Sequence, residues 1–251
     1  MIRVRRALTG ALLGLLLATT VAVLATELKP IEIPADYQHE RWGTQPRDIV
    51  RDFRAYTVSF DSQDDNDGDG AGEAWGIPEW VAYEIKQHPD PPRKGPERPR
   101  PWITDEGRHE QEIAPDDASY TGSTYDRGHM CQKLIAFRLG PNADWNTHTV
   151  LNACPQEPDL NRGIWLDLEK KTAEWADGHG AVWVVCGPVF FGRRPRHWVG
   201  DQGEVPVAVP DAFFKVVVKE SAVPDHPDVL AFLYPHHRYR GGDSTTIGLS
   251  S

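Results

Sequence analysis

The sequence predicts a mixed α+β domain with strands on both sides of one long helix. Three β-branched and aromatic runs bounded by Pro, Gly or Asp follow the helix, at residues 181–191, 205–219 and 229–235. An alternating run at 54–61 precedes it, and the helical pattern itself covers 159–178. The chain has 251 residues, of which 39% are hydrophobic, so it is long enough to bury one core and we expect one domain.

Residues 1–25 have the pattern of a segment that is separate from this domain. The chain begins with the basic stretch MIRVRR, residues 7–25 are apolar, and the first acidic residue is Glu27. This is typical of a secretory signal peptide with small-residue cleavage after Ala25. Because the apolar run is 19 residues long, an uncleaved membrane anchor is an alternative, and an Arg-rich organellar presequence is another. We expect a body that is exported to the periplasm or the medium, with a membrane tether only if the leader stays uncleaved.

We place the domain itself at residues 50–240. An irregular lead-in at 26–49 precedes it, and 241–251 is expected to be a flexible C-terminal tail. The segment 78–86 fits either a strand or a short helix, and 147–155 reads as a strand that ends just before the long helix.

The loop at 88–102 is the most basic part of the body. Its prolines remove backbone donors and prevent regular structure, so we expect it to be extended. It carries Arg93, Lys94, Arg98 and Arg100, which belong either to a solvated loop or to a phosphate-facing one. Without the leader, however, the chain has a formal charge of about −13, which argues against binding nucleic acid through bulk electrostatics. A nucleic-acid function therefore needs a local basic or metal-bearing site.

The stretch YDRGHM at 125–130 combines an acid, an arginine, a glycine and a histidine. Asp126 can accept a hydrogen bond from an imidazole or from the backbone, and Gly128 allows a backbone conformation that is closed to other residues. Arg127 offers a planar fork for a phosphate. A histidine such as His129 is neutral near pH 7 and is therefore suited to act as a general base. By itself, a four-residue DRGH also describes an ordinary surface turn.

The helix at 159–178 carries apolar side chains on one side, and Gly178 is expected to end it. If the helix begins near Asn161, Glu169 lies ~12 Å further along the axis and is rotated by about 80°. The two side chains therefore cannot easily both bind one metal ion directly. Asn161 is suited to bind a metal ion while Glu169 reaches its water shell, an arrangement that fits Mg²⁺. The alternative is that Asp159 or Asn161 only caps the helix and Glu169 faces solvent.

The three cysteines are Cys131, Cys154 and Cys186. In an exported protein they allow one disulfide and a leftover thiol, with three pairings to choose from. The alternative is that they are small buried side chains, which the apolar run VWVVCGPVF favours for Cys186. No CxxC or Cys/His cluster indicates zinc.

YDRGHM and the later VLNACPQEPDLNRGIWLDLEKK resemble the DNA/RNA non-specific endonucleases, which are ββα-metal nucleases. The resemblance depends on the ordered set DRGH, N-x-x-P-Q, L-N and L-E, and it covers residues 50–235. It implies a mixed or antiparallel sheet and a ββα-metal finger motif that carries the active site. It also implies a metal-dependent hydrolase, an endonuclease that cuts the phosphodiester bonds of DNA and RNA and leaves 5′-phosphate ends.

The same resemblance implies roles for five residues. His129 is expected to be the general base and Asn161 the direct ligand of Mg²⁺, for which Mn²⁺ or another divalent ion can substitute. Glu169 is expected to hold metal-bound water and Asn152 to support the site, both as part of the catalytic set. Arg127 is expected to contact the phosphate. DNA and RNA are the implied substrates, and no stable protein partner is implied.

The chain departs from the family pattern four residues after the glutamate. Many members have an arginine there, whereas this chain has Ala173. Lys170 and Lys171 are candidates to bind substrate in its place.

Two other functions are compatible with the sequence. A phosphodiesterase that acts on small nucleotide-like substrates would agree better with the acidic body. An exported nucleic-acid-binding module of the same fold, with little or no turnover, is the other, and the intact set of His129, Asn161 and Glu169 argues against it.

Overall fold

The computed structural model describes residues 27–32, 36–45, 49–61, 74–91, 98–103, 115–140, 142–223, 225–238 and 247–249. The predicted leader at 1–25, together with Arg93 and Lys94 of the basic loop, lies outside these residues. Within them, no helix is both long and apolar enough to cross a membrane.

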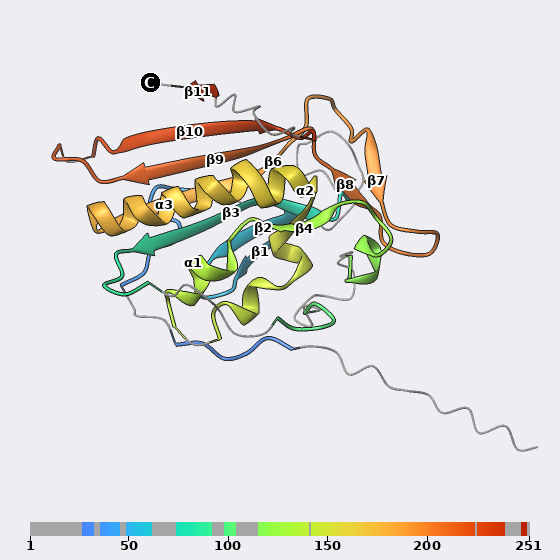
Figure 1. Ribbon diagram of the computed structural model, residues 1–251, viewed down its shortest axis with the longest axis horizontal. Coiled ribbons are helices and arrows are strands. Elements are labelled where there is room, and N and C mark those ends of the chain that lie inside the picture. The colour runs from blue at the N-terminus through green and yellow to red at the C-terminus, as the bar shows by residue number, and fades with distance from the viewer. Residues whose placement is uncertain are drawn as a thin grey trace, which may run out of the picture.

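A seven-stranded sheet forms the centre of the fold, and every neighbouring pair of its strands is antiparallel (Figure 1). The strands, in spatial order, are β1 (Ile49–Asp52), β2 (Thr57–Asp61), β3 (Ile77–Lys86), β6 (Ala181–Val189), β9 (Ala212–Lys219), β10 (Asp228–Pro235) and β11 (Ile247–Leu249). The runs at 54–61, 78–86, 181–191 and 229–235 become β2, β3, β6 and β10, and most of 205–219 becomes β9. The predicted α+β class is confirmed, in its antiparallel form.

The two faces of this sheet are covered by different parts of the chain. Side chains alternate between the faces along a strand, so Tyr83 of β3 points into the core while Glu84 points the other way. On the outer face, the N–H of Gln38 in the lead-in donates to Glu84 Oε2 (2.7 Å). The Trp42 ring packs edge-on against Trp183, with 5.8 Å between their centroids. β3 is therefore buried along nearly its whole length.

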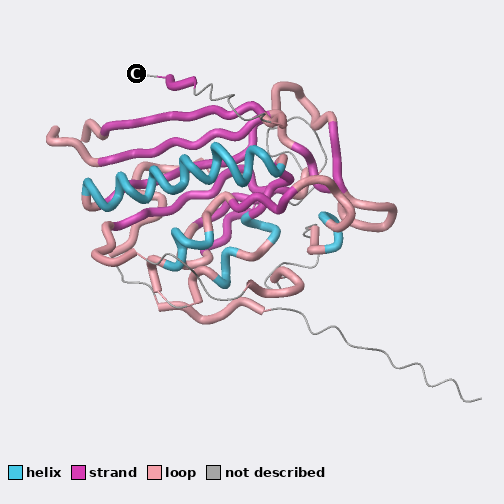
Figure 2. The backbone as a smooth tube through the Cα atoms, viewed as in Figure 1, coloured by secondary structure: helices cyan, strands magenta, loops and turns pink. Residues whose placement is uncertain are grey.

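The inner face carries a β-β-α unit. β4 (Asp126–His129) pairs antiparallel with β5 (Ala153–Gln156), and β5 leads into a helical segment. This segment consists of α2 (Pro158–Leu160), a π-helical turn at Asn161–Trp165 and α3 (Leu166–His179). α3 lies along the inner face over β3 and β6 (Figure 1; Figure 2). The ββα order that the resemblance implies is thus present.

The helical segment is less regular than the sequence predicts. Gly163 has non-helical backbone angles (φ −105°, ψ −114°), and the chain makes its π-helical turn around it. The helix also continues through Gly178 to His179. It ends there because Gly180 adopts a left-handed conformation (φ 90°) that favours glycine. The prediction that Gly178 ends the helix is therefore wrong.

Two other local predictions are corrected. Of the strand predicted at 147–155, only the last part becomes β5, and the preceding residues form 3₁₀ turns at Trp145–Thr147 and Val150–Asn152. The Thr149 hydroxyl accepts a hydrogen bond from the N–H of Leu151 (3.3 Å), a local bond that competes with strand pairing. The DRGH stretch forms the short strand β4 and not a surface turn.

The remaining elements are small. They are α1 (Lys133–Phe137), a 3₁₀ turn at Ala118–Tyr120, and a ribbon of β7 (His197–Val199) and β8 (Val207–Val209). β11 lies within 241–251, the segment expected to be a flexible tail. It pairs with β10, so this part of the tail joins the sheet.

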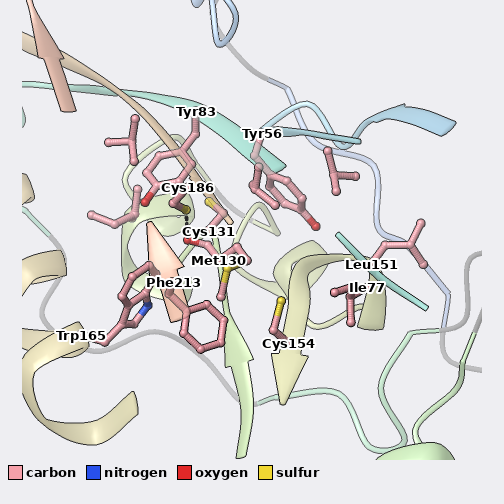
Figure 3. Close-up of a cluster of buried hydrophobic side chains, with 14 of the residues drawn as sticks. Tyr56, Ile77, Tyr83, Met130, Cys131, Leu151, Cys154, Trp165, Cys186 and Phe213 are labelled. Atoms are coloured by element: carbon pink, nitrogen blue, oxygen red, sulfur yellow. Dashed lines mark hydrogen bonds between the residues drawn. The ribbon is translucent and has the colours of Figure 1, made fainter. Parts of the chain in front are cut away.

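All three cysteines are free and fully buried in the core (Figure 3). Cys186 Sγ donates to the carbonyl oxygen of Met130 (3.3 Å), and burial raises the pKa of its thiol to about 11. Burial raises the pKa of the Cys131 and Cys154 thiols as well. The alternative of small buried side chains is confirmed, and the alternative of a disulfide is wrong.

Candidate active site

A cleft of about 740 Å³ opens between β4, the helical segment and residues 98–102. Of the five residues to which the family resemblance assigns roles, four line it, namely Arg127, His129, Asn161 and Glu169. β4 supplies the first two and the helical segment supplies the other two. The β-β-α unit therefore brings together side chains that are far apart in the sequence.

The imidazole of His129 is partly buried at the end of β4. The rings of Trp102 and His148 pack against it, with centroids 4.9 and 4.8 Å away. Burial lowers the pKa of His129 well below its usual value, and the nearby His148, Arg98 and Lys133 lower it further. The imidazole is therefore neutral at neutral pH and able to accept a proton.

His148 is a component of the site that the sequence analysis missed. It is fully buried, and its Nδ1 lies 3.1 Å from the carbonyl oxygen of Asp144. Because a carbonyl oxygen only accepts, this contact places the proton on Nδ1. Burial lowers the pKa of His148 to about 4, so this ring is neutral too and packs edge-on against His129. The sequence does not reveal this role, because a single histidine in the strand-like run THTVL has the pattern of a packing residue.

Gly128 is required for a different reason from the one expected. Its φ is not positive, so backbone freedom does not explain it. Instead, the side chain of Gln156, on the paired strand β5, lies directly over it. A Cβ at this position would be 2.6 Å from Gln156 Cγ and would overlap the end of that fully buried side chain as well. The glycine of DRGH and the glutamine of N-x-x-P-Q therefore depend on each other.

We expect Gly128→Ala to lower the free energy of unfolding by about 1–3 kcal/mol, because the added methyl overpacks a buried contact. Urea denaturation measures the change. Gly178→Ala is the matched control, since Gly178 is exposed in α3 with nothing within 4 Å of an added Cβ. It should stabilise the protein by roughly 0.5–1 kcal/mol. Equal stability of Gly128→Ala and the unmodified protein would contradict the packing argument.

Asn152 joins the end of β4 to the turn that precedes β5. Its Oδ1 accepts from the N–H of Cys131 (2.8 Å). Its Nδ2 donates to the carbonyl oxygens of Cys131 (2.9 Å) and Thr147 (3.0 Å). The fully buried amide thus has backbone partners at both ends and does not line the cleft. Its geometry suits a residue that holds the backbone next to His129.

Asp126 holds the start of the helical segment against β4. Its Oδ2 accepts from Asn161 Nδ2 (2.9 Å) and from Arg162 Nε (2.8 Å), and its Oδ1 accepts from Arg162 Nη2 (2.5 Å). Among the described contacts, these side-chain donors take the place of both donors that the sequence allowed, an imidazole and a backbone N–H. The capping interpretation of Asn161 is also wrong, because the helical segment begins after Glu157 and the Asn161 amide bonds to Asp126 instead.

Glu169 lies in the first turn of α3 and is only 5% exposed, although it lines the cleft. Burial raises its pKa to about 7, and Lys215 opposes this rise, with Nζ 4.0 Å from Oε1. The interpretation of Glu169 as a solvent-facing residue is therefore wrong. Because the π-helical turn interrupts the helix, the ideal spacing between Asn161 and Glu169 does not apply, and both side chains reach one cleft.

Arg127 forms an ion pair with Asp117. Its Nη2 donates to the carbonyl oxygen of Asp117 (2.6 Å), and its Nε lies 2.8 Å from Asp117 Oδ1. The guanidinium also lies over the rings of Tyr120 and Trp102, with 5.4 and 5.8 Å to the centroids. These contacts hold the guanidinium at the edge of the cleft in one orientation.

The lining of the cleft is more basic than the body of the protein. Among the described residues, the carboxylates of Asp126 and Glu169 line it, together with four basic side chains, those of Arg98, Arg127, Lys133 and Arg162. Of the two basic residues of the 88–102 loop that the structure describes, Arg98 lines the cleft and Arg100 does not. The cleft is a local basic site in an acidic protein.

Residues 43–248 match the DNA/RNA non-specific endonuclease family. The chain belongs to this family. It is 36% identical to human mitochondrial endonuclease G over 111 residues, which are 42% of this chain and 37% of the relative. It is 34% identical to a nuclease of Serratia marcescens over 179 residues, which are 65% of this chain and 60% of the relative. The matched segments thus span less than two thirds of either relative.

A chain in the crystal structure of the EndoG/EndoGI complex has the same fold. It superposes with a TM-score of 0.60 and covers 81% of this chain and 80% of its own length, at 23% identity. The fold and the family assignment therefore agree.

The position at which this member of the endonuclease family departs from its pattern is packed against the core. Ala173 is partly buried there. Lys170 and Lys171 are exposed on α3, where their Nζ atoms donate to Asp167 (3.1 Å) and Glu174 (2.8 Å). Neither lysine lines the cleft. Arg98 and Arg162 are better placed than these lysines to face a phosphate in it.

Proposed function

We propose that the protein is a metal-dependent endonuclease that hydrolyses phosphodiester bonds of both DNA and RNA. One observation carries the proposal, namely that a neutral His129 shares a basic-lined cleft with Asn161 and Glu169. Membership of the DNA/RNA non-specific endonuclease family supports the substrate class.

In this proposal His129 is the general base. Its neutral imidazole takes a proton from the water whose oxygen attacks phosphorus, while Trp102 and His148 keep the ring in place. General base catalysis by a positioned side chain contributes typically about 10²–10⁴-fold to a rate. A bond forms between the water oxygen and phosphorus, the bond from phosphorus to the 3′ oxygen breaks, and this oxygen takes a proton from solvent water while His129 returns its own proton to solvent. The products carry a 5′-phosphate and a 3′-hydroxyl.

Asn161 and Glu169 fit a Mg²⁺ site, because amide and carboxylate oxygens are the hard ligands that this ion prefers. The hydrogen bond from Asn161 Nδ2 to Asp126 fixes which end of the amide is occupied and leaves Oδ1 for a cation. Asn161 would hold the ion directly, and Glu169 would hold water bound to it. When bound, Mg²⁺ or Mn²⁺ supplies charge stabilisation for the phosphate and the leaving oxygen.

The basic side chains would bind the substrate backbone. Arg127 is already oriented by Asp117 and lines the cleft, so we assign it to the scissile phosphate. Arg98 and Arg162 would neutralise neighbouring phosphates. A local basic lining of this kind removes the conflict between a nucleic-acid substrate and an acidic body.

Digestion of plasmid DNA and of single-stranded RNA tests the proposal. Both should be cut in Mg²⁺ and neither in EDTA, and the ends should be ligatable 5′-phosphates. Cutting of small phosphodiesters alone would favour the phosphodiesterase alternative. Binding of nucleic acid without cutting in Mg²⁺ or Mn²⁺ would favour the binding module.

A further inference from the structure

Lys215 lies at an unusual position for a charged residue. It is in the middle of β9, on the inner face of the sheet, between the buried Phe213 and Val217. It is completely buried, and within the described residues its Nζ makes no hydrogen bond. A buried ammonium group is costly unless another charge compensates it. The groups around Nζ therefore indicate why the lysine is there.

Two side chains of the helical segment lie close to this ammonium group. Glu169 Oε1 is 4.0 Å from Nζ and belongs to the one carboxylate found this close to it in the described part of the chain. On another side, Nζ lies 4.1 Å from the centroid of the Trp165 ring, a distance typical of a cation–π contact. Trp165 Nε1 also donates to the carbonyl oxygen of His129 (3.4 Å). The Lys215–Glu169 pair is thus connected to the strand end that carries the proposed base.

We propose that Lys215 is a positioning residue whose buried ammonium group fixes the Glu169 carboxylate against the core, so that this carboxylate lines the cleft in one orientation. This inference rests on the proposed function, because it concerns how Glu169 serves a bound cation. Lys215 itself does not line the cleft, so it acts through Glu169 and not on the substrate.

The charges around Glu169 show why a cation behind it matters. Burial favours the neutral carboxylic acid and raises its pKa to about 7, and Lys215 is the largest influence in the opposite direction. Lys170, on the same helix, is exposed and paired with Asp167. The other titratable groups packed nearby are those of Tyr83, Cys131 and Cys186, whose pKa values burial raises, so they stay neutral at pH 7. Without Lys215, the buried Glu169 carboxylate would lose the cation that lies beside it and the contact that fixes its orientation in the cleft.

Binding of Mn²⁺ alone, measured by calorimetry at pH 7, tests the inference. Lys215→Met keeps most of the length of the side chain and removes the charge. It should reduce the affinity about 10-fold or more, because loss of a group that orients a metal-site side chain typically costs about 10–100-fold. Lys219→Met, at the partly exposed end of the same strand, is the matched control and should leave the affinity unchanged.

Introducing Lys215→Met into the Glu169→Gln variant distinguishes an effect of Lys215 on Glu169 from a general loss of stability. There Lys215→Met should cause no further loss of Mn²⁺ affinity, because the group through which it acts is gone. It should also raise the Tm, because Glu169→Gln alone leaves a buried ammonium uncompensated. This comparison remains informative if Lys215→Met alone does not fold. An unchanged Mn²⁺ affinity in Lys215→Met, or a lower Tm in the double variant than in Glu169→Gln, would overturn the inference. Failure of the unmodified protein to bind Mn²⁺ would instead refute the proposed metal site.

Discussion

His129→Ala is expected to slow the cutting of plasmid DNA and single-stranded RNA by about 10²–10⁴-fold, because it removes the group that takes the proton from water. Binding of Mn²⁺ should be retained, since the proposed ligand Asn161 lies on a different element, and calorimetry checks this. The loss should therefore appear in the rate at saturating Mg²⁺ and not in the Mg²⁺ concentration that is needed.

The matched control for this variant is His226→Ala. His226 is exposed in the turn before β10 and is far from β4 in the sequence, so its side chain should be dispensable. Rates close to those of the unmodified protein are expected. If His129→Ala cut nucleic acid at the normal rate, the proposed mechanism would be refuted even if the family assignment stood.

Asn161→Ala is expected to weaken the binding of Mn²⁺ on the order of 100-fold or more, because it removes a direct ligand, and changes even to groups that only orient a ligand cost 10–100-fold. Cutting in Mg²⁺ should fall with it. Calorimetry gives the affinity, and a titration of the cutting rate with Mg²⁺ gives the functional consequence.

Arg162→Ala is the control that disturbs the surroundings of the proposed ligand Asn161 without removing the ligand itself. Arg162 shares Asp126 with Asn161 but is exposed, so this variant removes a partner of Asp126 and leaves the Asn161 amide in place. Its loss of Mn²⁺ affinity should be clearly smaller than that of Asn161→Ala. A cutting rate with unchanged Mg²⁺ dependence in Asn161→Ala would exclude that residue as a ligand.

Most of the sheet could be predicted because most of its strands are recognisable runs of apolar, β-branched and aromatic residues. The apolar run that became β6 is largely buried, and the apolar run that became β10 is visible in the sequence although only Tyr234 on it is buried. β4 was not predictable in this way. It has four residues, one of them a glycine, and the reason for the glycine lies in Gln156, which only the pairing with β5 brings close.

The residues of the candidate site, which the structure brings to one cleft, could be named from the sequence, whereas the residues that support them could not. His129, Asn161 and Glu169 were found through motif order. Their partners are distant in sequence and carry no local signal, as Asp117 beside Arg127 and Lys215 behind Glu169 illustrate. One indication of Lys215 was present in the sequence, because a lysine occupies an inward position of an otherwise apolar strand. Its role can be inferred only when the helix that packs against this strand is known.

The three buried thiols have a consequence for how this protein matures. No covalent cross-link has to form, and each thiol stays protonated and shielded from oxidants because burial raises its pKa. The chain can therefore reach its folded state by packing alone, without a thiol oxidase or a disulfide isomerase. The same fold is available in a reducing compartment and in an oxidising one.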